Sequence, residues 1–237
     1  MFRKSIKILI GLVALLAIAS IITYLIYNEP LPKGQAGPEA DALAQKMLTA
    51  INNEAYKNTR YLEWGFRNGE HTYKWDKALG KVKVSWDDIM VDLNLSQTEK
   101  SRVYDKGEII SETQERDKTI KKAIDLFNND SFWLVAPFKV FDKGVERRIV
   151  PRDDGAKALL ITYTSGGSTP GDSYLWELQP NGFPISFKLW VKIIPIGGLK
   201  ATWDDWQLTE SGAFLPKTHS LGPIKLDMGN VKAYNQD

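Results

Sequence analysis

An unbroken apolar run near the N-terminus constrains this chain more than any other feature. Residues 8–26 contain no charged side chain, and only Ser20 and Thr23 interrupt the run as polar residues. A helix rises about 1.5 Å per residue, so this run reaches about the thickness of a bilayer's hydrocarbon core. Both hydroxyl groups can bond to the carbonyls of their own helix. We therefore expect a single-pass membrane anchor over residues 8–27.

Basic residues before the run indicate its orientation. Arg3, Lys4 and Lys7 place positive charge ahead of the apolar segment, and such charge marks the cytoplasmic side. We expect a cytoplasmic basic tip over residues 1–7. The remaining chain then lies outside the cytoplasmic (inner) membrane, in the periplasm or an equivalent extracytoplasmic space.

A cleaved secretory signal is the competing interpretation of the same segment. Ala17-Ile18-Ala19 has the small-x-small form that signal peptidase favours. However, residues 20–26 stay apolar after this motif, whereas a cleaved signal usually turns polar there. The longer apolar run favours an anchor that is retained.

A proline- and glycine-rich segment follows the apolar run. Residues 28–37 include Pro30, Pro32, Gly34 and Gly37, a composition that disfavours regular structure and is typical of a short linker. We expect one extracytoplasmic domain over residues 38–237, because the remaining length suits one sizeable core rather than two.

Composition excludes several classes of function for this domain. Removing the three basic residues of the tip from the formal net charge of +2 leaves −1 for the rest, so nothing predicts binding of nucleic acid. The chain contains no cysteine and two histidines, which excludes disulfides, thiolate metal sites and cysteine nucleophiles. We expect no catalytic residues, no metal and no cofactor.

Hydrophobic periodicity predicts helix first and then mostly strand. Apolar residues from Ala40 to Ala55 recur at spacings of three and four, which predicts an amphipathic helix over 38–56. From Tyr61 to Trp86 the period becomes two, with a turn at Asn68-Gly69. Helical spacing returns near Ser111, where Ser111 and Gln114 fit a capping box.

The C-terminal half alternates again, with a tight turn at Asn181-Gly182. Ile185, Phe187, Leu189, Val191 and Ile193 should share one face of a strand. Tight turns between strands favour antiparallel pairing. The pattern predicts a mostly β, α+β domain: a curved antiparallel sheet, or half-barrel, with helices packed on its concave face.

Other motifs have structural explanations. Residues 166–173 nearly spell a phosphate-binding loop, but Asp172 stands where the lysine should be and a strand follows in place of a helix. We expect a glycine-rich hairpin loop that could border a cavity. The acidic pairs at 87–88, 153–154 and 204–205 are typical of turns, and His71 and His219 lack any recognisable catalytic partner.

The order of elements resembles the LolA-like group of periplasmic lipoprotein carriers, with its RseB and LppX types. The opening helix, the strands to Ile110, the inserted region 111–141 and the closing strands follow in the same order over residues 38–237. The resemblance implies a half-barrel with an apolar cavity, and 132–141 resembles the lid. This chain departs from the soluble carriers in its predicted anchor, and no functional residue carries over.

We therefore expect a membrane-tethered, non-enzymatic protein that binds a hydrophobic ligand, either a lipid or the acyl chain of a lipoprotein. The alternative is an interaction or sensory module of the same fold that recognises an envelope protein. An enzyme would need converging carboxylates, such as Asp88 with Asp205. The candidate cavity lining consists of strand residues with one lid residue: Leu62, Trp64, Phe66, Val84, Trp86, Trp133, Phe187, Leu189 and Val191.

Overall fold

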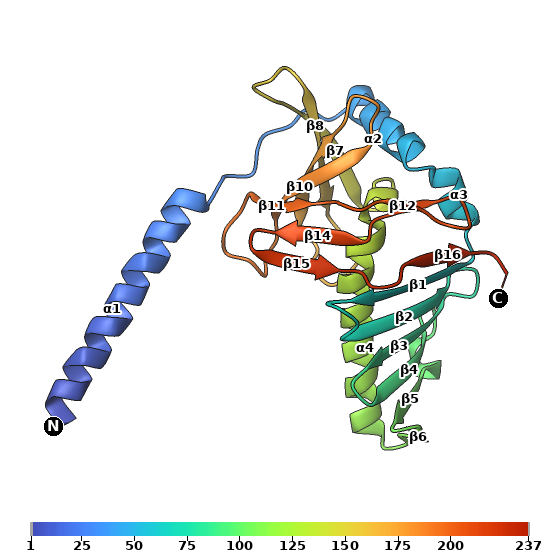
Figure 1. Cartoon of the computed structure of the whole chain (residues 1–237), viewed down its shortest axis with the longest axis horizontal. Helices are drawn as coiled ribbons and strands as arrows, with labels where there is room; N and C mark the ends of the chain where they lie inside the picture. Colours follow the sequence, from blue (N-terminus) through green and yellow to red (C-terminus); the bar gives the residue numbers. More distant parts are fainter. Residues whose placement is uncertain (1, 237) are drawn as a thin grey trace.

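The computed structural model describes residues 2–236, without the side chains at positions 2–4, 7–9, 17, 19 and 20. The side chains of Arg3, Lys4 and Lys7 in the predicted basic tip, and of Ala17 and Ala19 in the predicted cleavage motif, therefore lie outside the described part. Helix α1 (Phe2–Tyr27) projects from the domain as a separate rod (Figure 1). Its segment Ile10–Tyr27 is long and apolar enough to cross a membrane and none of it is buried. A single N-terminal helix of this kind suits an anchor or a signal sequence.

The rest of the chain is α+β, with two antiparallel sheets and one long helix, which confirms the predicted class. The β part is divided between two seven-stranded sheets and is not one continuous sheet. The N-terminal sheet has the order β16 (Lys232–Tyr234), β1 (Tyr61–Phe66), β2 (His71–Asp76), β3 (Lys81–Trp86), β4 (Ile89–Asn94), β5 (Arg102–Asp105) and β6 (Glu108–Ile109).

The C-terminal sheet is built from the second half of the chain. Its order is β15 (Ile224–Asp227), β14 (Thr218–Leu221), β11 (Leu199–Thr202), β10 (Pro184–Trp190), β9 (Ser173–Leu178), β8 (Lys157–Tyr163) and β7 (Val145–Pro151). A small pair, β12 (Gln207–Leu208) and β13 (Phe214–Leu215), lies between β11 and β14 in the sequence. The sequence patterns did not predict strands β7, β15 and β16.

The two sheets meet at a close backbone contact. The Gly65 amide of β1 donates to the Met228 carbonyl at 2.9 Å, just after β15. A side chain at Gly229, which has a φ of +62°, would approach the Gly65 backbone to 3.2 Å. Glycine at both positions lets the chain leave one sheet and enter the other without a steric clash.

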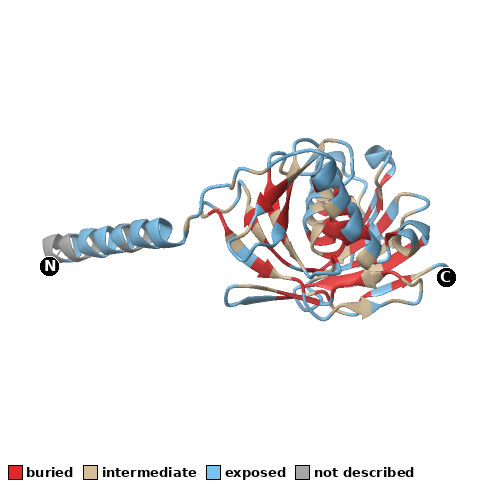
Figure 2. Cartoon of the chain, turned by 90° about the horizontal axis from the view of Figure 1, so that it is seen from above, coloured by how far each residue is buried: buried red, intermediate tan, exposed pale blue. Residues whose placement is uncertain are grey.

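Helix α4 (Thr113–Val135) lies across the inner faces of both sheets (Figure 1). Its Phe127 contacts Trp75 of β2, and its Phe132 contacts Tyr174 of β9, with ring centroids 5.2 and 4.7 Å apart. The buried residues gather between helix and sheets, as the red segments of Figure 2 show. At the start of α4 the Glu112 side chain accepts hydrogen bonds from two backbone amides. The predicted Ser111–Gln114 capping box is therefore wrong, because the cap lies one residue later.

The apolar segment that follows continues the helix. Residues 131–135 complete α4, and Ala136–Lys139 form a 3₁₀ helix, η2. Pro137 lacks an amide hydrogen and cannot continue the α-helical bonding. Another 3₁₀ turn, η1 (Thr98–Lys100), precedes β5.

The predicted helix over 38–56 is interrupted. Helix α2 (Pro38–Ala50) packs against β7 and β8, and α3 (Asn53–Asn58) follows it. Asn52 between them has a φ of +57°, and its side-chain amide donates to the Gly212 carbonyl at 2.8 Å. Asparagine tolerates the left-handed conformation better than most residues, so the helix ends there.

A bulge changes the predicted face of β10. The register with β9 shifts between Pro184 and Ser186, which leaves one extra residue on β10. Ile185 is therefore exposed while Phe187 and Leu189 are buried. The prediction that Ile185 shares their face is wrong for this reason.

The linker is docked on the C-terminal sheet. Residues 28–37 form no helix, as expected, but Gln35 forms a bridge with Ile149 of β7. Glu29 forms an ion pair with Lys188 of β10, at 2.7 Å from Oε2 to Nζ. These bonds hold the segment against the domain, so it is not a free spacer.

Candidate functional site: an apolar cavity beside the long helix

A cavity of about 440 Å³ lies between α4 and the C-terminal sheet. It is bordered by the last turns of α4, by residues just after η2, by the β8–β9 loop, and by the segment that follows β10. The volume falls within the ~300–1,000 Å³ that is usual for small-molecule sites. The cavity therefore has the size and concave shape of a ligand site.

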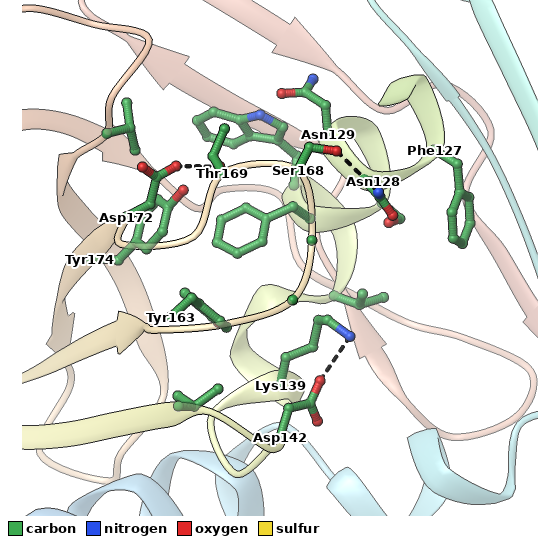
Figure 3. A pocket seen from close by; sticks show the side chains of 18 of the residues that line it. Phe127, Asn128, Asn129, Lys139, Asp142, Tyr163, Ser168, Thr169, Asp172 and Tyr174 are labelled. Atoms are coloured by element: carbon green, nitrogen blue, oxygen red, sulfur yellow. Dashed lines mark hydrogen bonds and ion pairs between the residues drawn. The ribbon is translucent and has the colours of Figure 1, made fainter. Parts of the chain in front are cut away.

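Aromatic rings form one wall of the cavity. Phe132 of α4 lies 5.5 Å from the Tyr163 ring and 4.7 Å from the Tyr174 ring, between centroids. Trp133 lies on the same helix and contacts Phe187 at 5.6 Å. Figure 3 shows Tyr163 and Tyr174 in the strands that face the helix. Such rings supply large apolar area to a ligand.

Both tyrosines are neutral in this environment. Burial raises the pKa of Tyr163 well above its ordinary value, with further contributions from Tyr174 and Asp142. Burial also raises the pKa of Tyr174, and Asp172 adds to the shift. Tyr163 donates a long hydrogen bond of 3.4 Å to the Ala136 carbonyl. Within residues 2–236 no partner is found for the Tyr174 hydroxyl, which leaves it available to a ligand.

The glycine-rich loop between β8 and β9 borders the cavity, as predicted. Gly166 and Gly167 have φ values of +80° and +61°, and both line the cavity. Ser168 accepts a hydrogen bond of 3.1 Å from Asn128 of α4 (Figure 3). The loop is thereby tied to the helix across the cavity. A side chain added at Gly166 or Gly167 would meet nothing within 4 Å, so both positions border open space.

Asp172 joins this loop to the segment after β10. It is 4% exposed, and its carboxylate accepts from the Thr169 hydroxyl at 2.5 Å and from the Lys192 amide at 3.0 Å. A buried carboxylate is stable when such donors satisfy it. Asp172 is therefore a structural residue that shapes the cavity border. This role explains why the position holds an aspartate and not the lysine of a phosphate-binding loop.

Charged side chains lie on the side of the cavity near η2. Lys139 and Asp142 form an ion pair of 2.9 Å (Figure 3), and Lys143 lies beside them. Both partners of the pair are about half exposed. The cavity thus combines apolar walls with a charged, solvated border, which suits an amphiphilic molecule.

Three of the nine predicted lining residues border this cavity: Trp133, Leu189 and Val191. The other six are packed in the core and do not line it: Leu62, Trp64, Phe66, Val84, Trp86 and Phe187. The five among them that lie on the N-terminal sheet face α4, whose Phe127 fills the space beside Trp64. Sequence reasoning missed Phe132, Tyr163 and Tyr174 as lining residues. The dense apolar segment that begins at residue 132 could have indicated Phe132.

A buried polar cluster lies on the other side of α4. Asp130 is 1% exposed, and its Oδ2 accepts from the Tyr73 hydroxyl at 2.6 Å and contacts His71 Nδ1 at 2.7 Å. Asn129 donates to the other oxygen at 2.8 Å. No serine, threonine or lysine nucleophile belongs to this set of contacts. The cluster links β2 to α4 and explains His71 as a structural residue.

The second histidine is buried in the C-terminal sheet. His219 contacts the Thr202 carbonyl through Nδ1 at 3.0 Å, and the Trp203 ring lies 4.5 Å from it. Burial lowers its pKa to about 4. Among the described residues no group of three histidine, aspartate or glutamate side chains could hold a metal ion. Asp87-Asp88 and Asp153-Asp154 lie in turns, as predicted.

Fold and cavity together define an α+β protein whose long helix packs on both sheets and borders a cavity that lies mainly against the C-terminal sheet, with Trp75 and Leu95 from the N-terminal half also in its lining. No protein-family model and no curated protein matches the sequence. Among solved structures, a DUF1329 family protein from Desulfovibrio piger ATCC 29098 is similar, with 9% identity and a TM-score of 0.40. The match covers 82% of this chain and 92% of the other. At these values the similarity transfers no ligand, activity or site residue to this chain.

Proposed function

We propose that this chain is a membrane-tethered, extracytoplasmic binding protein that is not an enzyme and that takes up the acyl chain of a lipid or lipoprotein. One observation carries the proposal: the cavity of about 440 Å³ beside α4, with its wall of Phe132, Trp133, Tyr163 and Tyr174. Removing an acyl chain from water is favourable by about 25 cal/mol per Å² of apolar surface. The charged border with Lys139 suits a polar headgroup.

The location in this proposal depends on α1. Its segment Ile10–Tyr27 is exposed along its length and apolar, and the basic residues before it favour a cytoplasmic N-terminus. The domain then lies outside the inner membrane. The mass of the chain purified from membranes tests this directly, because a chain cut after Ala19 would overturn the retained anchor.

Photo-crosslinking in the intact chain tests the ligand. A benzoylphenylalanine introduced at Trp133 faces the cavity, whereas the same group at Leu208, which is 64% exposed, serves as the control. After irradiation of cells, we expect lipid adducts at position 133 and none above background at 208. An unmodified mass at 133 would contradict the proposal.

A second variant connects the adduct to the cavity. Val191 lines the cavity and is only partly buried, so Val191→Trp should fill the space without breaking the core. The adduct yield at position 133 should then fall about tenfold, as burial of several methylene groups is lost. Leu208→Trp is the matched control and should leave the yield unchanged. An equal yield in both variants would place the ligand elsewhere.

A further inference from the structure

The segment between β10 and β11 combines one strongly exposed isoleucine and two partly exposed ones with a place beside α1. Residues 191–198 include Ile193, Ile194 and Ile196, with one lysine and no acidic residue. Ile193 is 73% exposed, more than any other large hydrophobic side chain that the structure describes. An apolar side chain held in water at this level costs free energy unless a partner covers it.

Hydrogen bonds hold this segment against the residues that directly follow the apolar helix. The Gly197 amide donates to Asn28 Oδ1 at 2.8 Å, and the Glu29 amide donates to the Gly197 carbonyl at 3.0 Å. Trp190 Nε1 also donates to the Glu29 carbonyl at 2.8 Å. Because Asn28 adjoins Tyr27, the last residue of α1, the segment lies within a few residues of the end of the span (Figure 1).

The two glycines of the segment make this contact sterically feasible. A side chain at Gly197 would approach Trp190 Cδ1 to 2.4 Å and the Glu29 carbonyl to 2.9 Å. A side chain at Gly198, whose φ is +81°, would approach Glu29 Cβ to 2.6 Å. The segment can therefore pack this closely against the linker only because both positions are glycine.

The same segment also borders the cavity. Val191, Ile193 and Ile194 all line it, beside Leu189 of β10. The segment thus lies between the cavity on one side and the end of α1 on the other.

From this geometry we infer that residues 191–198 rest in the interface of the bilayer that holds α1, and that they form the entrance through which lipid reaches the cavity. Membrane contact follows from the exposed Ile193, the partly exposed Ile194 and Ile196, and the bonds to Asn28 and Glu29. The entrance role rests on the proposed function. Isoleucine side chains at this depth replace contact with water by contact with acyl chains.

Fluorescence quenching tests the membrane contact by itself. The chain has no cysteine, so Ile193→Cys provides a unique site for a fluorescent label in the full chain. In vesicles of phosphatidylethanolamine and phosphatidylglycerol, we expect strong quenching by doxyl-labelled lipid. Ile109→Cys is the matched control, since Ile109 is 59% exposed on the outer strand β6, and it should not be quenched. Absence of quenching at 193 would overturn the membrane contact. A label at 193 that is shielded from water but not quenched would indicate a protein partner in place of the bilayer.

Lipid loading tests the entrance. In the chain that carries benzoylphenylalanine at Trp133, Ile193→Asp should lower the initial rate of adduct formation about tenfold, because a carboxylate is unfavourable at the interface. Ile109→Asp should leave the rate unchanged. Equal rates of adduct formation in both variants would contradict the entrance role of residues 191–198 but would leave lipid binding in the cavity supported. If no variant forms adducts, the proposed function fails, and the quenching result still decides the membrane contact.

Discussion

The two sheets pack differently against helix α4. Against the N-terminal sheet, Phe127 of α4 lies 6.2 Å from Trp64 and 6.4 Å from Tyr73, and these rings fill the space. Against the C-terminal sheet, Phe132 reaches Tyr163 and Tyr174, and a cavity remains beside them. Hairpins β1–β4 have equal strand lengths and short turns, whereas long loops follow β8 and β10. The two long loops border most of the cavity, and the N-terminal sheet side contributes only Trp75 and Leu95 to its lining.

The largest expected effect contrasts the packed core at Trp64 with the cavity border at Trp133. Trp64 is 2% exposed and stacks on Tyr73 at 4.5 Å, so Trp64→Ala should lower the free energy of unfolding by about 3–5 kcal/mol. Trp133 already borders the cavity, so Trp133→Ala should cost about 1–2 kcal/mol. Urea unfolding of the full chain, followed by circular dichroism, measures both. Equal losses would mean that the cavity is closed in solution.

The polar cluster should matter almost as much. Asp130→Ala leaves the Tyr73 hydroxyl and His71 without their buried acceptor, and the expected loss is about 3 kcal/mol. Asp130→Asn keeps an acceptor and should lose less. The matched control is Asp142→Ala, which breaks a half-exposed pair with Lys139 and should cost less than about 1 kcal/mol. Urea unfolding measures the free energy of unfolding of each variant. A loss for Asp142→Ala as large as that for Asp130→Ala would contradict the prediction.

The buried His219 should make the stability of the domain depend on pH. Burial lowers the pKa of His219 to about 4, from an ordinary value of 6.5. Between these pH values the unfolded chain takes up a proton that the folded chain does not. The stability that this residue contributes is therefore complete above pH 6.5 and is lost as the pH falls towards 4, by up to about 3 kcal/mol.

His219→Leu should remove this part of the pH dependence. Carboxylates titrate in the wild type and in the variant alike, so the difference between their unfolding curves from pH 7 to pH 4 isolates the histidine. Parallel curves for the two chains would show that His219 is protonated when folded, in contradiction to the expected shift.

The smallest expected effect concerns the linker. Gly198→Ala combines an unfavourable positive φ with a clash against Glu29, and should cost about 1–2 kcal/mol while it releases residues 28–37 to protease. Gly222→Ala is the matched control, because its φ is +56° and nothing lies within 4 Å of the added carbon. Only Gly198→Ala should speed cleavage of the linker. Equal cleavage of both variants would mean that the docked linker gives no protection.

Local sequence patterns predicted much of the fold. The alternation in Leu62, Trp64 and Phe66 and the turn at Asn68-Gly69 identified β1 and β2, because one buried face requires a period of two. The first part of helix α4, to Phe127, was predicted from its apolar spacing, whereas periodicity did not assign the segment from Ser131 to helix or strand. The break at Asn52 was missed because its side chain bonds Gly212, which is distant in the sequence. The bulge at Ile185 was missed because strand alternation does not indicate where the register with β9 shifts.

The candidate site was less accessible from sequence. Alternation shows that Trp64 and Leu189 both face inward, but not which of them meets a helix and which meets a cavity. That choice depends on where α4 crosses each sheet. Phe127 packs against Trp75, Phe132 packs against Tyr163 and Tyr174, and the cavity lies beside both contacts.

The sequence by itself determined the apolar N-terminal helix, the antiparallel strands and the absence of cysteine chemistry, because composition and short-range period are sufficient for these. Only the tertiary structure decided that the β part forms two sheets, that the cavity lies beside the C-terminal one, and that Gly197 is bonded to Asn28. The physical reason is the range of the interactions. Helix and strand periods repeat within a few residues, whereas cavities and docked linkers arise where segments far apart in the chain pack together.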